Sequence, residues 1–317
     1  MKCRLGLLGL LASASFLLGA CSSRSEQANV KHIGILQYME HESLTETREG
    51  IIEELEKQGY ENGKDIVLDY QNAQGDQASL QSISENLVKD NDLVIGITTQ
   101  SSQALQVANT DKPIIFSAVT DPVSAKLVKS MKNSDGLVTG VSNRQPLEPL
   151  FTALQTVLPK AKTVGIMYTT SERNAEVQVE NAKDLLKKAG YKMIVKGITS
   201  TNDVQDAAKQ LMKETDVLYV PTDNIVASAM TLLGDLSRES GIPVIGGSAD
   251  MVEEGGLMTY GPDYRALGRQ TAQMAIKVLK GQKVNDIPAE YPKDTELVVN
   301  EEMAKDLKIN TKDLNKK

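Results

Sequence analysis

Hydrophobic and polar positions alternate along the chain as short apolar runs separated by longer amphipathic stretches. The apolar runs, rich in Ile, Val and Leu, predict buried β-strands, and the stretches between them predict helices. In the first half, the predicted strands cover 32–37, 65–70, 92–97, 113–118 and 136–141. The first helix is predicted to begin at Ser43, because Glu46 follows three residues later as in a capping box, and to stop at Gly59. Strands alternating with helices are typical of parallel βαβ units.

The second half of the chain repeats the order of the first. The run TVGIMY (163–168) corresponds to HIGILQ (32–37), and GLMTYG (256–261) corresponds to GLVTGV (136–141). Between them, three further pairs keep the same order: 55–60 with 185–191, 89–105 with 213–229, and 112–120 with 242–250. Five pairs in unbroken order favour an internal duplication, and the alternative is two unrelated units of the same general pattern.

The duplication predicts an α/β fold of two similar Rossmann-like lobes with a ligand cleft between them. Each lobe would be a parallel sheet flanked by helices, and a length of 317 residues is ample for two domains. Lobe 1 is predicted at 31–142 with 263–290 returning to it, and lobe 2 at 143–262 with 291–317 returning to it. The last predicted strand covers 295–300.

The first 20 residues are predicted to be an export signal. Basic residues precede an apolar run at 5–18 that is too short for a comfortable membrane span. The sequence LGAC, ending at Cys21, resembles a bacterial lipoprotein signal, in which cleavage before the cysteine leaves a sulfur that carries lipid. Cys21 would be the only cysteine of the mature chain, which favours lipidation over a disulfide. Residues 21–30 would then tether the protein to the extracytoplasmic face of the cell membrane; the alternative is an ordinary secretory signal.

Composition argues against nucleic-acid binding and gives little support to catalysis. The formal net charge of −7 and pI near 5.1 are unlike the basic face of a nucleic-acid binder. His32 and His41 are the only histidines, so no metal cluster, Cys–His pair or Ser–His–Asp set can be recognised. The sequence also lacks glycine-rich phosphate loops. We therefore expect no enzyme, metal or cofactor, although a hydrolase that uses only carboxylates stays open.

Ligands of open α/β sheets bind beyond the carboxyl ends of the strands, where this chain carries hydroxyl, amide, carboxylate and phenol groups. In lobe 1 the predicted ligand-binding residues are Tyr38, Thr99, Ser101, Ser102, Thr120, Asp121 and Asn143. In lobe 2 they are Tyr168, Ser171, Glu172, Asn174, Thr222, Asp223, Asn224, Ser248, Asp250 and Tyr260.

These groups suit a zwitterion with a flat side chain. Ser101 and Ser102 open a predicted helix, whose free N–H groups and dipole favour a carboxylate. Asp223, at the equivalent place in lobe 2, would meet an ammonium group. A tyrosine at a strand end can cover a flat ligand face. The alternatives are helix capping by the serines and Asp223, and tyrosines that only seal the sheet ends.

Three stretches resemble ABC transporter substrate-binding lipoproteins, a group that includes tryptophan- and aromatic-amino-acid-binding proteins. They are VPTDNIVASA (220–229), MVEEGGLMTYGPDYRALGRQTA (251–272) and LVVN (297–300). The resemblance covers essentially all of the mature chain and implies a type I periplasmic-binding fold. In that fold the chain crosses between the lobes three times, here near 141–145, 261–263 and 288–292.

The resemblance also implies a function. It favours closure of the two lobes over an aromatic amino acid, above all L-tryptophan, and delivery to an ABC permease and its ATPase. Ser248 and Ala249 stand where acidic residues are expected in many relatives, which leaves the ligand open.

Two other functions remain open on the sequence alone. The first is a surface sensor or binding lipoprotein for another amino acid, a nucleoside or a sugar, without a transport role. The second is an enzyme with two Rossmann-like lobes, such as a sugar transferase, which the export signal and the missing nucleotide motifs disfavour.

Overall fold

The computed structural model describes residues 30–134 and 136–314. The expected export signal at 1–20, the predicted lipidation site Cys21 and nearly all of the expected linker at 21–30 lie outside these residues. Among the helices that are described, none has both the length and the apolar character needed to span a bilayer.

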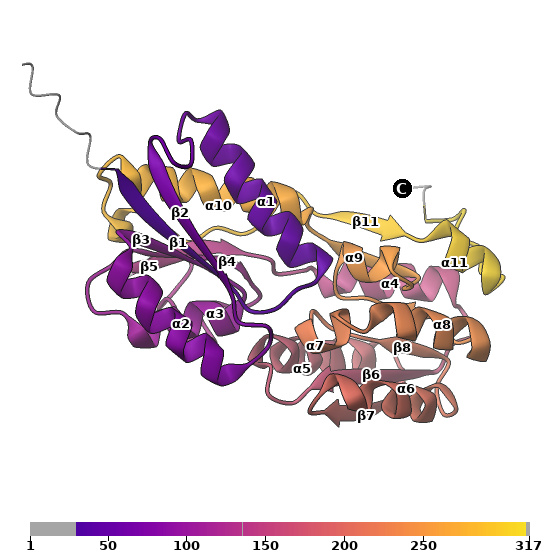
Figure 1. Cartoon of the computed structure of the whole chain (residues 1–317). Coiled ribbons are helices and arrows are strands. Elements are labelled where there is room, and N and C mark those ends of the chain that lie inside the picture. Colours follow the sequence, from indigo (N-terminus) through magenta and orange to yellow (C-terminus); the bar gives the residue numbers. More distant parts are fainter. Residues whose placement is uncertain (1–29, 135, 315–317) are drawn as a thin grey trace, which may run out of the picture.

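The described chain forms two α/β lobes, each built around its own sheet (Figure 1). The sheet of lobe 1 has the strand order β2-β1-β3-β4-β5, and every neighbouring pair is parallel. Its strands are β1 (Lys31–Gln37), β2 (Ile66–Asn72), β3 (Leu93–Ile97), β4 (Ile114–Val119) and β5 (Val138–Ser142). All five lie within two residues of the predicted runs.

The sheet of lobe 2 has the order β11-β10-β9-β8-β6-β7. Its strands are β6 (Thr163–Thr169), β7 (Lys192–Ile198), β8 (Val217–Tyr219), β9 (Val244–Ile245), β10 (Met258–Gly261) and β11 (Glu296–Val299). Without β11, this order repeats that of lobe 1 strand for strand, in agreement with the predicted duplication. The edge strand β11 departs from the predicted parallel sheet, because it runs antiparallel to β10. It follows an extended crossing from lobe 1 and not the helical crossover that a parallel neighbour needs.

Helices cover both faces of each sheet, as predicted. In lobe 1 they are α1 (Glu42–Lys57), α2 (Gln77–Asp90), α3 (Thr99–Ala108), α10 (Tyr264–Leu279) and the 3-10 turn η2 (Val284–Asp286). In lobe 2 they are α4 (Leu147–Val157), α5 (Arg173–Lys188), η1 (Thr201–Asp203), α6 (Val204–Met212), α7 (Asn224–Ala227), α8 (Met230–Ser240), α9 (Ala249–Glu253) and α11 (Glu301–Asp306). Helices α1 and α10 lie on one face of the first sheet, and α2 and α3 lie on the other (Figure 1).

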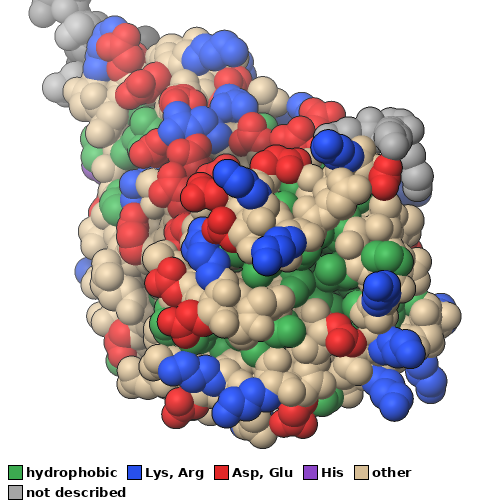
Figure 2. All heavy atoms as spheres, turned by 90° about the vertical axis from the view of Figure 1, so that its right-hand side faces the viewer, with side chains coloured by type: hydrophobic (Ala, Val, Ile, Leu, Met, Phe, Trp, Pro, Cys, Tyr) green, Lys and Arg blue, Asp and Glu red, His purple; other side chains and the backbone are tan. Residues whose placement is uncertain are grey.

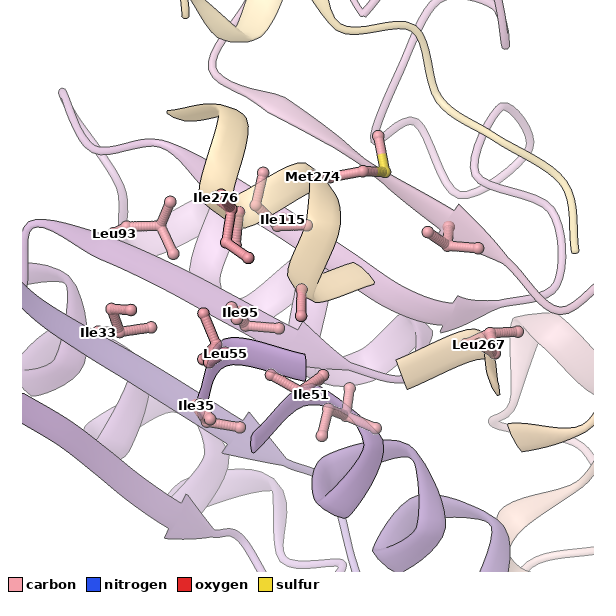
Figure 3. Close-up of a cluster of buried hydrophobic side chains, with 14 of the residues drawn as sticks. Ile33, Ile35, Ile51, Leu55, Leu93, Ile95, Ile115, Leu267, Met274 and Ile276 are labelled. Carbon is pink, nitrogen blue, oxygen red and sulfur yellow. The ribbon is translucent and has the colours of Figure 1, made fainter. Parts of the chain in front are cut away.

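The core beneath α1 and α10 shows why the late segment containing α10 packs on lobe 1. Buried Ile33 and Ile35 of β1 lie among side chains of both helices, including Ile51 and Leu267 (Figure 3). The helices approach closely because each carries a glycine at the crossing. A Cβ atom on Gly50 would lie 2.1 Å from the carbonyl oxygen of Arg265, and one on Gly268 would lie 2.1 Å from that of Thr47.

Charged side chains add a second link between these helices. Arg265 of α10 pairs with Glu46, Glu49 and Glu53 of α1, and its Nε lies 2.5 Å from Glu46 Oε2. All four side chains are partly exposed, so the pairs contribute less than the packing beneath them. Figure 2 shows a band of acidic side chains on one face of the molecule, with lysine and arginine side chains between them.

The start of α1 differs from the prediction. The helix begins at Glu42, after the N-cap residue His41, whose side chain makes no capping hydrogen bond. The hydroxyl of Ser43 donates to Asp250, and Glu46 is held by Arg265. The predicted capping box is therefore wrong, because tertiary partners take both side chains. Past the end of the helix, Gly59 has a φ of 86°, as expected for a glycine stop.

Candidate functional site

The two sheets direct the carboxyl ends of their strands to the cleft between the lobes, where mostly polar side chains line a small cavity. From lobe 1 its walls are formed by His41, Leu44, Thr98, Thr99, Ala118, Thr120, Asn143 and Tyr264. From lobe 2 they are formed by Asn174, Thr222 and Asn224. Among the predicted residues, those that line the cavity are Thr99, Thr120, Asn143, Asn174, Thr222 and Asn224.

Helix α3 begins at the lobe 1 wall. Its N-cap residue Thr98 accepts a bond from the backbone N of Ser101 at 3.4 Å and has a φ of 94°. This conformation is strained for a β-branched residue, and such strain clusters at functional sites. Ser102 has an architectural role, because its hydroxyl donates to the carbonyl oxygens of Gly96 at 3.1 Å and Thr98 at 2.7 Å.

Three buried oxygen atoms at this wall have no hydrogen-bond partner within the described part of the chain. They are Thr99 Oγ1, Ser101 Oγ and Asn143 Oδ1. The amide nitrogen of Asn143 donates to the hydroxyl of Tyr264 at 2.9 Å, so its oxygen remains available as an acceptor. Because burying an unpaired polar atom costs about 1–3 kcal/mol, these atoms favour a polar ligand.

Two buried carboxylates stand behind the lobe 2 wall, and each is 1% exposed. Glu172 accepts bonds from the side-chain nitrogens of Asn174 at 2.9 Å and Asn224 at 2.7 Å, and from backbone N–H groups at the start of α7. Glu172 therefore orients the two asparagines that line the cavity.

The second carboxylate, Asp223, accepts bonds from Thr169 N at 2.5 Å and Thr169 Oγ1 at 2.8 Å, and caps α7 through Val226 N at 3.0 Å. Burial, followed by the charge of Glu172, raises the pKa of Asp223 to about 8. Among the described residues, no lysine or arginine forms an ion pair with either carboxylate. A cation at this wall would stabilise the ionised form of Asp223 and offset its repulsion with Glu172.

Hydrogen bonds join the two lobes around the cavity. His41 of lobe 1 lies 3.3 Å (Nδ1) from Asp250 Oδ2 and 3.2 Å (Nε2) from Asn224 Oδ1. Gln100 Nε2 donates to Asn174 Oδ1 at 3.1 Å. The backbone N of Ser43 donates to Asp250 at 3.3 Å, and its hydroxyl donates to the same carboxylate. The lobes are therefore in direct contact, and the cavity is shut.

Several predicted residues lie near the cavity without lining it. Tyr38 packs in the lobe 1 core, where burial, then the charges of Glu172 and Asp223, raise its pKa to about 12. Tyr168 and Tyr260 pack against the lobe 2 core, which is the sheet-sealing alternative. Of the other predicted residues, Asp121 holds a turn and Ser171 is exposed. Ser248 is the N-cap residue of α9, and Asp250 forms the contact between the lobes.

The predicted set missed five lining residues, of which His41 and Tyr264 matter most. His41 ends the loop that joins β1 to α1, so its position between a strand and a helix was the available signal. Tyr264 lies in the first turn of α10, next to the expected crossing at 261–263, and reaches the cavity because α10 packs on lobe 1. Burial raises the pKa of Tyr264, so this hydroxyl stays protonated.

Comparison with known proteins gives consistent matches over nearly the whole described chain. A family model described as ABC transporter substrate binding protein matches residues 32–315. A tyrosine-binding protein of Clostridioides difficile (strain R20291) is 40% identical over 287 residues, which are 90% of this chain and 83% of the relative.

Two solved structures differ in how closely their shapes agree with this one. A Streptococcus pneumoniae ABC domain in complex with L-Trp, 35% identical, has a TM-score of 0.86 and is matched over 89% of this chain and 96% of its own. A ligand-free, open structure of a substrate-binding protein with adhesive properties from Clostridium difficile is 42% identical over the same shares, yet its TM-score is 0.70. The less identical protein has the more similar shape, as expected if the lobes here are arranged as in the complex.

Proposed function

Because the chain belongs to the family of ABC transporter substrate-binding proteins, we propose that it binds an aromatic amino acid between its lobes and delivers it to an ABC permease and its ATPase. The observation that carries this proposal is the shut cavity, with unpaired oxygens on one wall and buried carboxylates behind the other. Relatives named for tyrosine and solved with L-Trp support an aromatic side chain.

In this proposal the ligand's charges are held at opposite walls. The carboxylate lies at the start of α3, where backbone N–H groups and the hydroxyls of Thr99 and Ser101 can donate to it. The ammonium lies at the lobe 2 wall, in the field of Glu172 and Asp223. The aromatic ring lies against Tyr264 and neighbouring apolar side chains of the lining.

We propose that the mature protein begins at a lipidated Cys21 and remains on the extracytoplasmic face of the membrane, tethered by the polar residues that follow. Its work is binding without catalysis: the ligand bridges both lobes and stabilises the closed form, which the permease recognises.

Thermal unfolding tests the proposed ligand class. L-Tyrosine or L-tryptophan at a hundredfold excess over Kd should stabilise the folded protein by about 2.7 kcal/mol, which raises Tm by several degrees. D-Alanine, which has both charges but no ring and the opposite configuration, should leave Tm unchanged. If neither aromatic amino acid raises Tm while a sugar or nucleoside does, the ligand class is wrong and the fold assignment stands.

A further inference from the structure

The contact between the lobes contains a histidine whose two ring nitrogens both face acceptors. The His41 side chain is 7% exposed, and its partners are Asp250 Oδ2 and Asn224 Oδ1. The amide of Asn224 is oriented independently of the histidine, because its nitrogen donates to Glu172. Its oxygen must therefore point toward His41. With acceptors on both sides, each ring nitrogen must carry a proton, so the closed arrangement holds His41 as an imidazolium ion.

The same aspartate also completes a helix of the opposite lobe. Helix α1 of lobe 1 has no side-chain cap of its own, and Asp250 of lobe 2 accepts bonds from the backbone N and the hydroxyl of Ser43 in its first turn. A carboxylate at a helix N-terminus satisfies free N–H groups and interacts favourably with the dipole. Because this cap comes from the other lobe, separating the lobes removes the cap and the partner of His41 together.

The surrounding charges favour the protonated ring. The carboxylates facing it are Asp250 and Glu254 of the α9 segment and Glu172 before α5, while Tyr264 is neutral. Burial lowers the pKa of His41, but the bonds and charges of Asp250, Asn224 and Glu172 outweigh burial, so the net pKa is raised. Burial raises the pKa of Asp250, but His41 outweighs it and the net pKa is lowered. Both pKa shifts are in the directions expected for an ion pair between protonated His41 and ionised Asp250.

We propose that His41, Asp250 and Asn224 form a proton-linked latch, in which closing of the lobes takes up a proton on His41 and opening releases it. This inference rests on the proposed function, since it concerns the closure that retains the ligand. When the lobes separate, the ring should return toward its ordinary pKa of about 6.5. The latch is therefore at full strength below that value and weakens as pH rises through the raised pKa of the closed form.

Ligand affinity at two pH values tests the latch. The chain contains no tryptophan, so the emission of added L-tryptophan reports binding directly. Between about pH 6 and about pH 8, wild-type affinity should fall further than that of His41→Gln, because only the wild type loses the proton that holds the latch. Titration of Asp223 acts in the opposite direction, but it is common to both proteins. The exposed His32 supplies the control His32→Gln, which should behave as wild type. Equal pH dependence in wild type and His41→Gln would overturn the latch.

The pH dependence of lobe closure in the ligand-free protein separates failure of the latch from failure of the ligand assignment. If neither L-tyrosine nor L-tryptophan binds at any pH, the proposed ligand is wrong, and small-angle scattering of the ligand-free protein decides on the latch. The closed fraction should rise as pH falls through the ordinary histidine pKa of about 6.5 in the wild type and in His32→Gln, but not in His41→Gln. A closed fraction that responds to pH equally in the wild type and in His41→Gln contradicts the proposal.

Discussion

Replacing Glu172 by glutamine is expected to weaken the binding of L-tyrosine and L-tryptophan at least tenfold, or about 1.4 kcal/mol. The carboxylate accepts bonds from both cavity-lining asparagines and from backbone N–H groups of α7. A glutamine removes the negative charge that favours the ligand's ammonium and turns an NH₂ group toward donors. The asparagines should therefore lose their fixed orientation. The Kd values of the folded variant and the wild type, measured by calorimetry, give the loss.

The same helix provides a matched control. Glu176, one turn further along α5, forms an exposed pair with Arg173 at 2.6 Å. Such surface pairs contribute about 0–1 kcal/mol to stability, and this pair lies away from the cavity. Glu176→Gln should therefore keep wild-type affinity. If Glu172→Gln also bound the ligand with wild-type affinity, the Glu172 carboxylate would only stabilise the start of α7. The ammonium group would then have to bind elsewhere.

Introducing a methyl group at Gly50 is expected to destabilise the protein by about 2 kcal/mol or more. The added Cβ would lie 2.1 Å from the carbonyl oxygen of Arg265, so α1 and α10 would have to move apart. Overpacking of this kind costs about 1–3 kcal/mol and sometimes more, whereas the better helix propensity of alanine returns about 1 kcal/mol at most. Denaturant unfolding of Gly50→Ala measures the difference, and Gly268→Ala should behave in the same way.

A second alanine on the exposed side of α1 separates the clash from helix propensity. Glu56 is exposed, and Glu56→Ala should change the free energy of unfolding by no more than about 0.5 kcal/mol. If Gly50→Ala were as stable as the wild type, the close crossing would not be what holds α10 on lobe 1.

The positions of the strands could be predicted from the sequence because buried parallel strands appear in it as short apolar runs. All five lobe 1 strands and the repeated order in lobe 2 follow from that pattern. The antiparallel direction of β11 could not be predicted, because it depends on a crossing between lobes and not on local composition. The capping box at Ser43 and Glu46 failed for a similar reason: Asp250 and Arg265, more than 200 positions away, take both side chains.

The candidate site was predictable where it follows directly from a strand end. Thr99, Thr120 and Asn174 were found in this way, since parallel strands bring their carboxyl ends together. Tyr264 was missed because it follows a strand of lobe 2 but reaches the cavity from lobe 1. Tyr168 and Tyr260 do not line the cavity, because a tyrosine at a strand end can pack on the core instead. Side-chain direction depends on tertiary packing, which the alternation of apolar and polar residues does not specify.

The central claim, that an aromatic amino acid is buried between the lobes, is tested most directly by the fluorescence of L-tryptophan titrated with a protein that has none of its own. We expect a saturable blue shift in emission at one ligand per chain, reversed by excess L-tyrosine and reduced in Glu172→Gln. Emission identical to that in buffer, at protein concentrations well above micromolar, would contradict it.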